Sequence, residues 1–425
     1  MGLTDGYGNS ITTTSEVARD AYDRGVRLFL AGQYGPVTEF GACVAADPGF
    51  ALGHAGLSRA RMMAGDMAGA KASIATASDL ASTDKREAQH IAAMAALLAG
   101  RADEARRLVQ AHVGNFPRDA LLAQLCTNIF GLIGFSGKVG REAELYAYTS
   151  ALLPHYGNDW WMMSMHALSL CEVGEADASL TLMEQALALN PDNAHAVHFK
   201  AHAQYETGET AAGRAFLDDW MQGYDTRGLL HCHLNWHAAL WALQDGEIKT
   251  MWQLVDSGIA PGTGSGLPLN VVTDAAAIYH RAELAGVAVD PARWAALSDF
   301  AATCFPNPGQ SFADMHVALA HAMAGEGDRL AVLAETDKGF AGDLIAPVAR
   351  TWQAVARGDW SGALSELIPV MATAQRIGGS RAQRDILELT FANILLKLGR
   401  GEEAHRALRT RRPMLADAPP VAGWG

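Results

Sequence analysis

Apolar residues recur three and four positions apart along most of the chain, as in Val17–Leu30, Leu180–Leu189 and Leu387–Leu398. This spacing is typical of helices that bury one face, and no stretch keeps the strict alternation of apolar and polar residues that indicates a half-buried strand. The apolar runs also end before they reach about 18 to 20 residues, the length that crosses a bilayer. We therefore predict an all-α protein without a membrane span.

Glycines punctuate these helical segments at regular intervals, and each suits the left-handed residue that ends a helix before an antiparallel partner begins. The glycines are Gly32, Gly65, Gly100, Gly174, Gly208, Gly246, Gly286, Gly325, Gly358 and Gly399. Successive gaps are 33, 35, 74, 34, 38, 40, 39, 33 and 41 residues, so the period is a unit of 34 residues with insertions, and the gap of 74 holds two units. This spacing resembles that of tetratricopeptide repeats, in which each helix pair buries its apolar face against its neighbours. The resemblance implies a right-handed alpha-solenoid of about ten to twelve helix pairs.

Two glycine-rich stretches interrupt the series. Residues 128–140 lack a hydroxyl residue after their lysine, which argues against a phosphate-binding loop and favours a break in the solenoid. Residues 258–269 hold four glycines and two prolines, and we interpret them as a mobile surface loop. We expect one solenoid over residues 1–416, followed by a disordered tail at 417–425.

The composition narrows the class of protein. Hydrophobic residues make up 49% of the chain and charged residues 19%, enough apolar surface for an extensive core. The formal net charge of -13 argues against binding to nucleic acid, because phosphates would be repelled. The five cysteines never form a CxxC pair, so we expect free thiols. The first 15 residues lack the features of a signal peptide, and we expect the protein in the cytoplasm.

Histidines carry the strongest chemical signal in the sequence. His198 and His202 are four residues apart, as are His233 and His237, so each pair lies on one face of its predicted helix. Counted back from the turn glycine of its own repeat, a histidine recurs eight to ten residues earlier in five repeats. These five are His90, His166, His198, His237 and His316.

Three interpretations of these histidines compete. They are core residues that hydrogen-bond to neighbours, or they line a small-molecule pocket whose apolar walls are tryptophans, or they bind a metal ion. Two i,i+4 pairs are adequate zinc or iron ligands, but no HExxH motif is present, so a metal at His198, His202, His233 and His237 is not favoured and no cofactor is expected. The tetratricopeptide resemblance places these four residues and Glu206 on the concave face.

The order of the motifs resembles the tetratricopeptide repeat protein 38 family over nearly the whole chain. The resemblance rests on segments such as Gly8–Leu30, Lys85–Gly100, the VTDAAAIYHRAEL segment, FADMHVALAHAMAG and Ile377–Ile386. It implies the fold and the position of the site, and it defines no reaction. In Ile377–Ile386, Ser380 is placed to cap the helix that follows it.

Our primary hypothesis is a cytoplasmic solenoid whose concave His/Trp-lined pocket binds a small organic molecule, with hydrolase or lyase chemistry by histidine acid/base groups as one version. The alternative is a scaffold that binds a peptide or a partner protein without catalysis. The candidate catalytic residues are His198, His202, His233, His237, His316 and Asp314. The candidate ligand-binding residues are Trp161, Trp236, Glu206, His166, Arg384 and Gln383.

Overall fold

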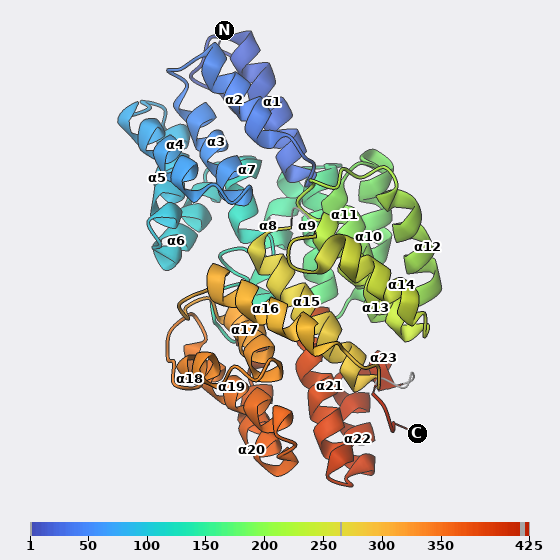
Figure 1. The fold of residues 1–425 in the computed structure, drawn as a ribbon. Helices are drawn as coiled ribbons and strands as arrows, with labels where there is room; N and C mark the ends of the chain where they lie inside the picture. Colours follow the sequence, from blue (N-terminus) through green and yellow to red (C-terminus); the bar gives the residue numbers. More distant parts are fainter. Residues whose placement is uncertain (1, 264–265, 417–420, 425) are drawn as a thin grey trace. The chain divides into compact units, whose positions relative to one another are not determined.

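The computed structural model describes residues 2–263, 266–416 and 421–424, and over these residues it is built from helices with one isolated bridge between Thr4 and Ser10 (Figure 1). The predicted all-α solenoid class is confirmed. The chain forms two compact units, and the expectation of a single solenoid over residues 1–416 stays a prediction. Unit 1 comprises residues 1–134, 142–200 and 227–230, and unit 2 comprises residues 135–141, 201–226 and 231–425.

Unit 1 consists of consecutive helix pairs in which α1 packs on α2, α3 on α4, α5 on α6 and α9 on α10. Its elements are α1 (Glu16–Leu30), α2 (Pro36–Ala46), α3 (Ala51–Met63), α4 (Met67–Asp79), α5 (Lys85–Leu98), α6 (Ala102–Val113), α7 (Ala120–Ala123), η1 (Gln124–Cys126), α8 (Arg141–Leu152), η2 (Leu153–His155), α9 (Trp160–Glu172) and α10 (Ala176–Leu189). Helix α11 (Ala194–Thr207) belongs to unit 1 up to Lys200 and to unit 2 from Ala201.

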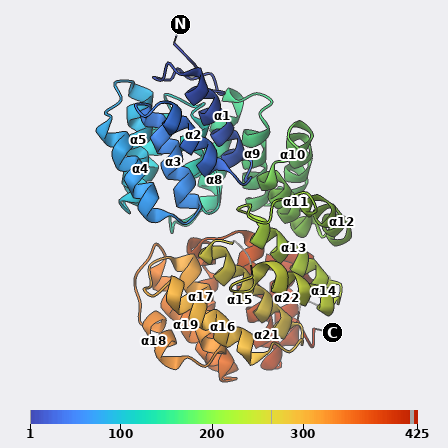
Figure 2. The same cartoon turned by 45° about the horizontal axis from the view of Figure 1, so that its top comes forward.

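Unit 2 continues the same architecture. Its elements are α12 (Thr210–Met221), α13 (His231–Gln244), α14 (Ile248–Leu254), η3 (Val255–Ile259), α15 (Pro268–Leu284), α16 (Pro291–Cys304), α17 (Ser311–Met323), α18 (Gly327–Ala334), α19 (Gly342–Ala356), α20 (Trp360–Met371), η4 (Ala374–Ile377), α21 (Arg381–Lys397), α22 (Gly401–Arg411) and α23 (Pro413–Ala416). Figure 2 shows α13, α15 and α17 side by side, and α15 also contacts α21. The inner face of α15 is therefore covered by other helices of the same unit.

All ten predicted turn glycines adopt positive φ angles, from 68° at Gly32 to 98° at Gly174. Each follows the first helix of a pair, where a residue with a Cβ would be strained. In the described residues these turns join ten helix pairs, and the 74-residue gap holds an irregular further unit made of α7, η1 and α8. The glycine spacing therefore identified the repeat correctly.

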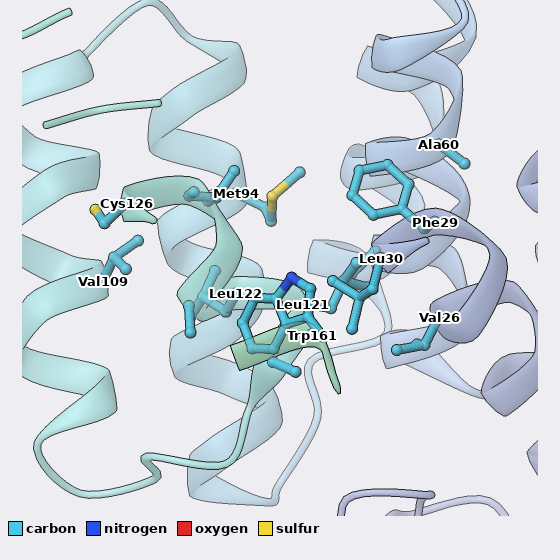
Figure 3. Packing of buried hydrophobic residues seen from close by; sticks show 14 of the residues in the cluster. Val26, Phe29, Leu30, Ala60, Met94, Val109, Leu121, Leu122, Cys126 and Trp161 are labelled. Atoms are coloured by element: carbon cyan, nitrogen blue, oxygen red, sulfur yellow. The ribbon is translucent and has the colours of Figure 1, made fainter. Parts of the chain in front are cut away.

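The core of unit 1 forms where the pairs stack. Phe29 and Leu30 of α1 lie near Met94 of α5 and Trp161 of α9 in Figure 3, and Leu30, Met94 and Trp161 are at most 1% exposed. Small residues allow close approach between helices: a Cβ at Gly56 of α3 would lie 2.4 Å from the Phe40 ring of α2. Packing of this kind supplies most of the stability of a helical repeat.

The two predicted interruptions of the helical series differ in the structure. Residues 128–140 contain turns and no helix, as the break in the series predicted. The predicted mobile loop at 258–269 is partly helical, because η3 reaches Ile259 and α15 begins at Pro268, while residues 264–265 lie outside the described residues.

The expected disordered tail is described only in part, since residues 417–420 and 425 lie outside the structure's described residues. In contrast to that expectation, Val421 is 2% exposed and Trp424 is 6% exposed. The Ala422 amide donates to the Leu284 carbonyl at 2.7 Å, and the Trp424 ring lies 4.0 Å from the His405 ring. These apolar side chains pack on unit 2. In the part of the chain that is described, no helix is both long and apolar enough to span a membrane.

Candidate functional site

Three of the predicted histidines meet in the interior of unit 2. His202 comes from α11, and His233 and His237 come from successive turns of α13, where the i,i+4 spacing puts both on one helix face. Each of the three is 1% exposed. Each of the three offers a ring nitrogen that lies within 4.8 Å of a ring nitrogen of both others. Three of the six candidate catalytic residues therefore lie close together in the structure.

The rings of this histidine cluster pack against each other and against an indole. The His202 ring centroid lies 4.5 Å from that of His237, and the His233 centroid lies 5.0 Å from that of His237. The Trp236 ring stacks on His233 at 5.0 Å with an interplanar angle of 11°. Trp236 was predicted as an apolar wall of a small-molecule pocket, and in the structure its ring packs on the His233 ring. The cluster is closely packed, with no exposed imidazole face.

A carboxylate from a third helix completes the cluster. Asp274 of α15 is 1% exposed and accepts a hydrogen bond from Nδ1 of His233, at 2.9 Å to one oxygen and 2.8 Å to the other. The Sγ of Cys232 lies 3.9 Å from the same carboxylate. Asp274 was not among the predicted site residues. Its signal in the sequence is a lone acid in the apolar run from Val271 to Ile278, an expensive position unless the charge is paired.

Burial sets the protonation of these groups. Desolvation lowers the pKa of His202 to about 3, with the neighbouring His233 acting in the same direction. Desolvation also holds the pKa of His237 well below 6.5, and the charge of Arg281 adds to this effect. Burial raises the pKa of Asp274, and its contact with His233 opposes that shift. His202 and His237 are therefore neutral at pH 7 and carry free-base ring nitrogens.

The predicted residues of α17 lie in other surroundings. His316 donates through Nδ1 to the Phe312 carbonyl of its own helix at 2.8 Å. Asp314 accepts the Gly309 amide at 2.9 Å, and burial raises its pKa to about 6. Neither belongs to the group of histidines that could share a metal among the described residues. The prediction that they join the other histidines in one catalytic site is not supported, because local backbone groups hold both side chains.

Glu206, Gln383 and Arg384 are also separate from the cluster. Glu206 accepts two hydrogen bonds from Arg412 at 2.6 and 2.7 Å. Gln383 closes the capping box predicted around Ser380, which accepts the Gln383 amide at 3.1 Å. Arg384 donates to the Gly379 carbonyl. These contacts lie at the ends of helices and account for the three side chains, which we predicted as ligand-binding residues.

Two predicted residues lie in unit 1 and act in its core. Trp161 is fully buried, with its ring 5.5 Å from Tyr156 and 6.4 Å from Tyr7. His166 stacks on Tyr146 at 5.5 Å and shares a hydrogen bond of 3.0 Å with Thr149. Both are explained by packing within unit 1. His198 lies one turn before His202 on α11, on the same face of that helix.

Unit 2 also contains a cleft that the sequence did not indicate. Its volume is about 150 Å³, and it lies among the carboxyl-terminal ends of α11, α13 and α15, beside α21 and α23. The lining residues are Tyr205, Gly208, Thr210, Leu240, Leu243, Gln244, Arg281, Ala285, Leu389, Met414 and Leu415. Gly208 and Ala285 are exposed, so this end of the cleft reaches the surface. The cleft brings together residues up to 210 positions apart, which no local pattern reveals.

Below the cleft, a buried polar network joins four helices. Tyr205 donates to Asp385 at 3.0 Å and accepts from Arg281 at 3.2 Å. Arg412 contacts Asp385 at 2.6 Å, and Asp385 is 1% exposed. Among the described residues, no carboxylate oxygen lies within 4 Å of the Arg281 guanidinium. Arg281 therefore brings a positive charge to the floor of the cleft without an ion pair of its own.

Comparison with known proteins adds support for the repeat. Residues 170–225, from the end of α9 through α12, match the family model described as tetratricopeptide repeat. Among solved structures, the human IFIT1 dimer with m7Gppp-AAAA is 13% identical over 94% of this chain and 96% of that chain, with a TM-score of 0.47. Yeast Tom70 is 11% identical over 92% of this chain and 83% of that chain, with a TM-score of 0.37.

Similarities at this level carry no conclusion about ligands or partners. The exclusion of nucleic acid rests on net charge alone, and it stays a prediction. Assignment to the tetratricopeptide repeat protein 38 family is likewise a prediction from the motif order. The chain is a helical-repeat protein that is similar to tetratricopeptide repeats over residues 170–225.

Proposed function

We propose that this protein is a peptide-binding scaffold and that the cleft of unit 2 binds a short apolar segment of a partner protein. One observation carries the proposal: Met414 and Leu415 of the chain's own short helix α23 line the cleft, together with residues at the ends of α13, α15 and α21. A surface that accepts two apolar side chains of a terminal segment has the shape and chemistry to accept similar side chains from another protein.

The size of the cleft favours side chains over a whole small molecule. Pockets for drug-sized ligands measure about 300 to 1,000 Å³. The cleft, at about 150 Å³, is half the lower limit. Leu240, Leu243 and Leu389 supply apolar walls on which two or three side chains can be desolvated.

Arg281 at the floor of the cleft adds a preference for an acidic group on the bound peptide. Arg281 is 6% exposed, and its guanidinium donates to the Tyr205 hydroxyl and to the Ala382 carbonyl. A carboxylate on the incoming peptide would therefore find an arginine that has no ion pair with an acid among the described residues of unit 2. Charge-assisted hydrogen bonds to arginine are roughly twice as strong as neutral ones. The occupant that fits best combines apolar side chains with an acidic group.

The geometry gives no comparable support to the small-molecule and enzyme hypotheses. The clustered histidines are 1% exposed and packed on one another, so a substrate has no route to their ring nitrogens without displacement of α11 or α13. General acid/base catalysis needs the base within hydrogen-bond reach of the substrate. Hydrolase or lyase chemistry at these histidines, and the cytoplasmic location, remain predictions from the sequence.

Peptide binding at the cleft is testable by fluorescence anisotropy. The probe is a labelled synthetic peptide that copies residues 412–425, and the receptor is the full chain carrying Met414→Lys and Leu415→Lys. The added charges have the same sign as Arg281, so they should release the chain's own segment from the cleft. We expect the released variant to bind the peptide at least about tenfold more tightly than the unaltered protein does, because the intramolecular competitor is gone.

Two further variants locate the binding site. Adding Leu243→Asp should abolish binding, because a carboxylate would lie on the apolar wall. Adding Val332→Asp on α18 should not, because Val332 is 55% exposed and lies outside the cleft. Binding that ignores Leu243→Asp, or no binding by the released variant, would overturn the proposal. Native mass spectrometry that finds a bound small molecule, lost in Leu243→Asp, would support the small-molecule hypothesis instead.

A further inference from the structure

We propose that the buried histidine cluster is a zinc site, in which ring nitrogens of His202, His233 and His237 bind Zn²⁺ and Asp274 orients His233. The proposal rests on the convergence of these side chains and is independent of the peptide-binding cleft. It assigns a second role to α11 and α13, whose opposite ends line that cleft.

The separations between the imidazoles suit a zinc ion. Zinc binds histidine nitrogen at about 2.0 to 2.1 Å in tetrahedral geometry, so bound nitrogens lie about 3.3 Å apart. The three available nitrogens of the cluster already lie within 4.8 Å of one another. These separations exceed those of a bound zinc site by at most about 1.5 Å.

The position of the Asp274 carboxylate supports a zinc site. Metal-binding histidines almost always direct their second ring nitrogen at a carboxylate, a carbonyl or a water, which fixes the ring and the tautomer. Asp274 engages Nδ1 of His233 with both oxygens at 2.8 and 2.9 Å. With Nδ1 directed at Asp274, Nε2 is the nitrogen through which His233 would bind a metal.

Other buried histidines of unit 2 show what an ordinary core histidine does in this fold. His316 bonds to the Phe312 carbonyl of its own helix, His280 to the Thr390 hydroxyl at 3.0 Å, and His321 to the Ser298 hydroxyl at 2.7 Å. Each binds one nearby oxygen. The cluster differs from these single histidines because three imidazoles from two helices lie close together and one of them is hydrogen-bonded to a buried aspartate.

The ligand set selects the metal. Neutral imidazole nitrogens suit Zn²⁺, Cu²⁺, Ni²⁺ and Fe²⁺, whereas Ca²⁺ and Mg²⁺ require oxygen ligands. Zinc fits best because it accepts tetrahedral nitrogen ligation without a demand for planar geometry. The fourth position is open to water or to His198, the remaining histidine that could offer a ligand atom, one turn before His202 on α11. The ion would fasten α11 to α13.

The test is a zinc titration of the full chain, purified with a histidine-free tag and stripped with a chelator, in competition with a chromophoric zinc indicator. We expect one Zn²⁺ per chain. Asp274→Asn should weaken the affinity about 10-fold to 100-fold, the usual effect of losing a carboxylate behind a ligand. His233→Gln and His237→Gln should weaken it by about 100-fold or more. His54→Gln, an exposed histidine of α3, is the matched control and should bind as the unaltered protein does.

A second measurement covers variants that fail to fold. In the unaltered protein, Co²⁺ replacing zinc should give the strong visible absorption of a tetrahedral site, and Zn²⁺ should reverse it. No stoichiometric zinc, a weak six-coordinate cobalt spectrum, or an affinity that the cluster variants leave unchanged would each overturn the proposal.

Discussion

The buried ion network beneath the cleft should set the stability of unit 2, and Asp385→Asn tests this directly. Asp385 is 1% exposed, lies 2.6 Å from Arg412 Nε, and accepts hydrogen bonds from Arg412 Nη2 at 2.8 Å and from the Tyr205 hydroxyl at 3.0 Å. An asparagine keeps the shape but loses the charge, and its amide hydrogens would face the guanidinium. Arg412 would remain buried with Glu206 as its other carboxylate partner.

The magnitude follows from burial. Breaking a buried ion pair by removing one partner costs about 3 to 5 kcal/mol. Because Arg412 keeps both hydrogen bonds to Glu206, we expect the lower end, about 3 kcal/mol. For a cooperative unit of this size, 1 kcal/mol shifts Tm by about 2 to 4 °C, so the expected decrease is about 6 to 12 °C. Differential scanning calorimetry measures it.

The same two helices provide a matched control. Glu388 of α21 pairs with Arg411 of α22 at 2.7 Å, but the Arg411 side chain is 40% exposed. Exposed pairs contribute about 0.2 to 1 kcal/mol, so Glu388→Gln should lower Tm by at most about 4 °C. Equal shifts for the two variants, or a loss below about 1 kcal/mol for Asp385→Asn, would refute the reasoning that burial decides the strength of these pairs.

Three further predictions concern pH, backbone and metal. Burial lowers the pKa of His316 and of His321 from 6.5 to about 4. The unfolded chain therefore binds these protons at a higher pH than the folded protein does, so Tm should fall as the pH decreases from about 6.5 to about 4. A Tm that stays constant over this range would contradict the prediction. Gly379 has φ +73°, and a Cβ there would lie 2.3 Å from Phe312. Gly379→Ala should therefore lower the free energy of unfolding, measured by urea denaturation, by about 2 kcal/mol or more. Gly399→Ala should lower it by about 1 kcal/mol, because φ is +72° there and space is open for the added Cβ. EDTA should lower Tm, because it removes the metal that stabilises the folded state. It should leave the far-ultraviolet circular dichroism at 25 °C unchanged, because packing between helices maintains the fold without the metal. Loss of the helical signal would show that folding requires the metal.

Local patterns predicted the features that depend on nearby residues. The turn glycines were identified from their spacing, and all ten have positive φ because a helix that reverses into its neighbour needs this conformation there. The pairing of His233 with His237 also follows from i,i+4 geometry. The Ser380 cap was found for the same reason, since its contacts are within three residues.

Features built from distant segments were not predictable in this way. Asp274 meets His233 across 41 residues, and Arg412 meets Glu206 across 206. Which residues of two helices meet depends on the superhelical packing of the intervening pairs, and the sequence period does not fix it. The tail was expected to be disordered from its composition, yet Trp424 packs on His405 because unit 2 offers an apolar surface there.

Hydrogen exchange at the carboxyl-terminal segment tests the central claim, that the cleft binds a peptide segment in place of α23. The Ala422 amide is bonded to the Leu284 carbonyl at 2.7 Å, next to the end of α15 that lines the cleft. If a saturating acidic, apolar peptide replaces α23 in the full-length protein, exchange in residues 413–424 should accelerate at least about tenfold while the ends of α13 and α21 stay protected. Peptide binding with unchanged exchange in this segment would contradict the account.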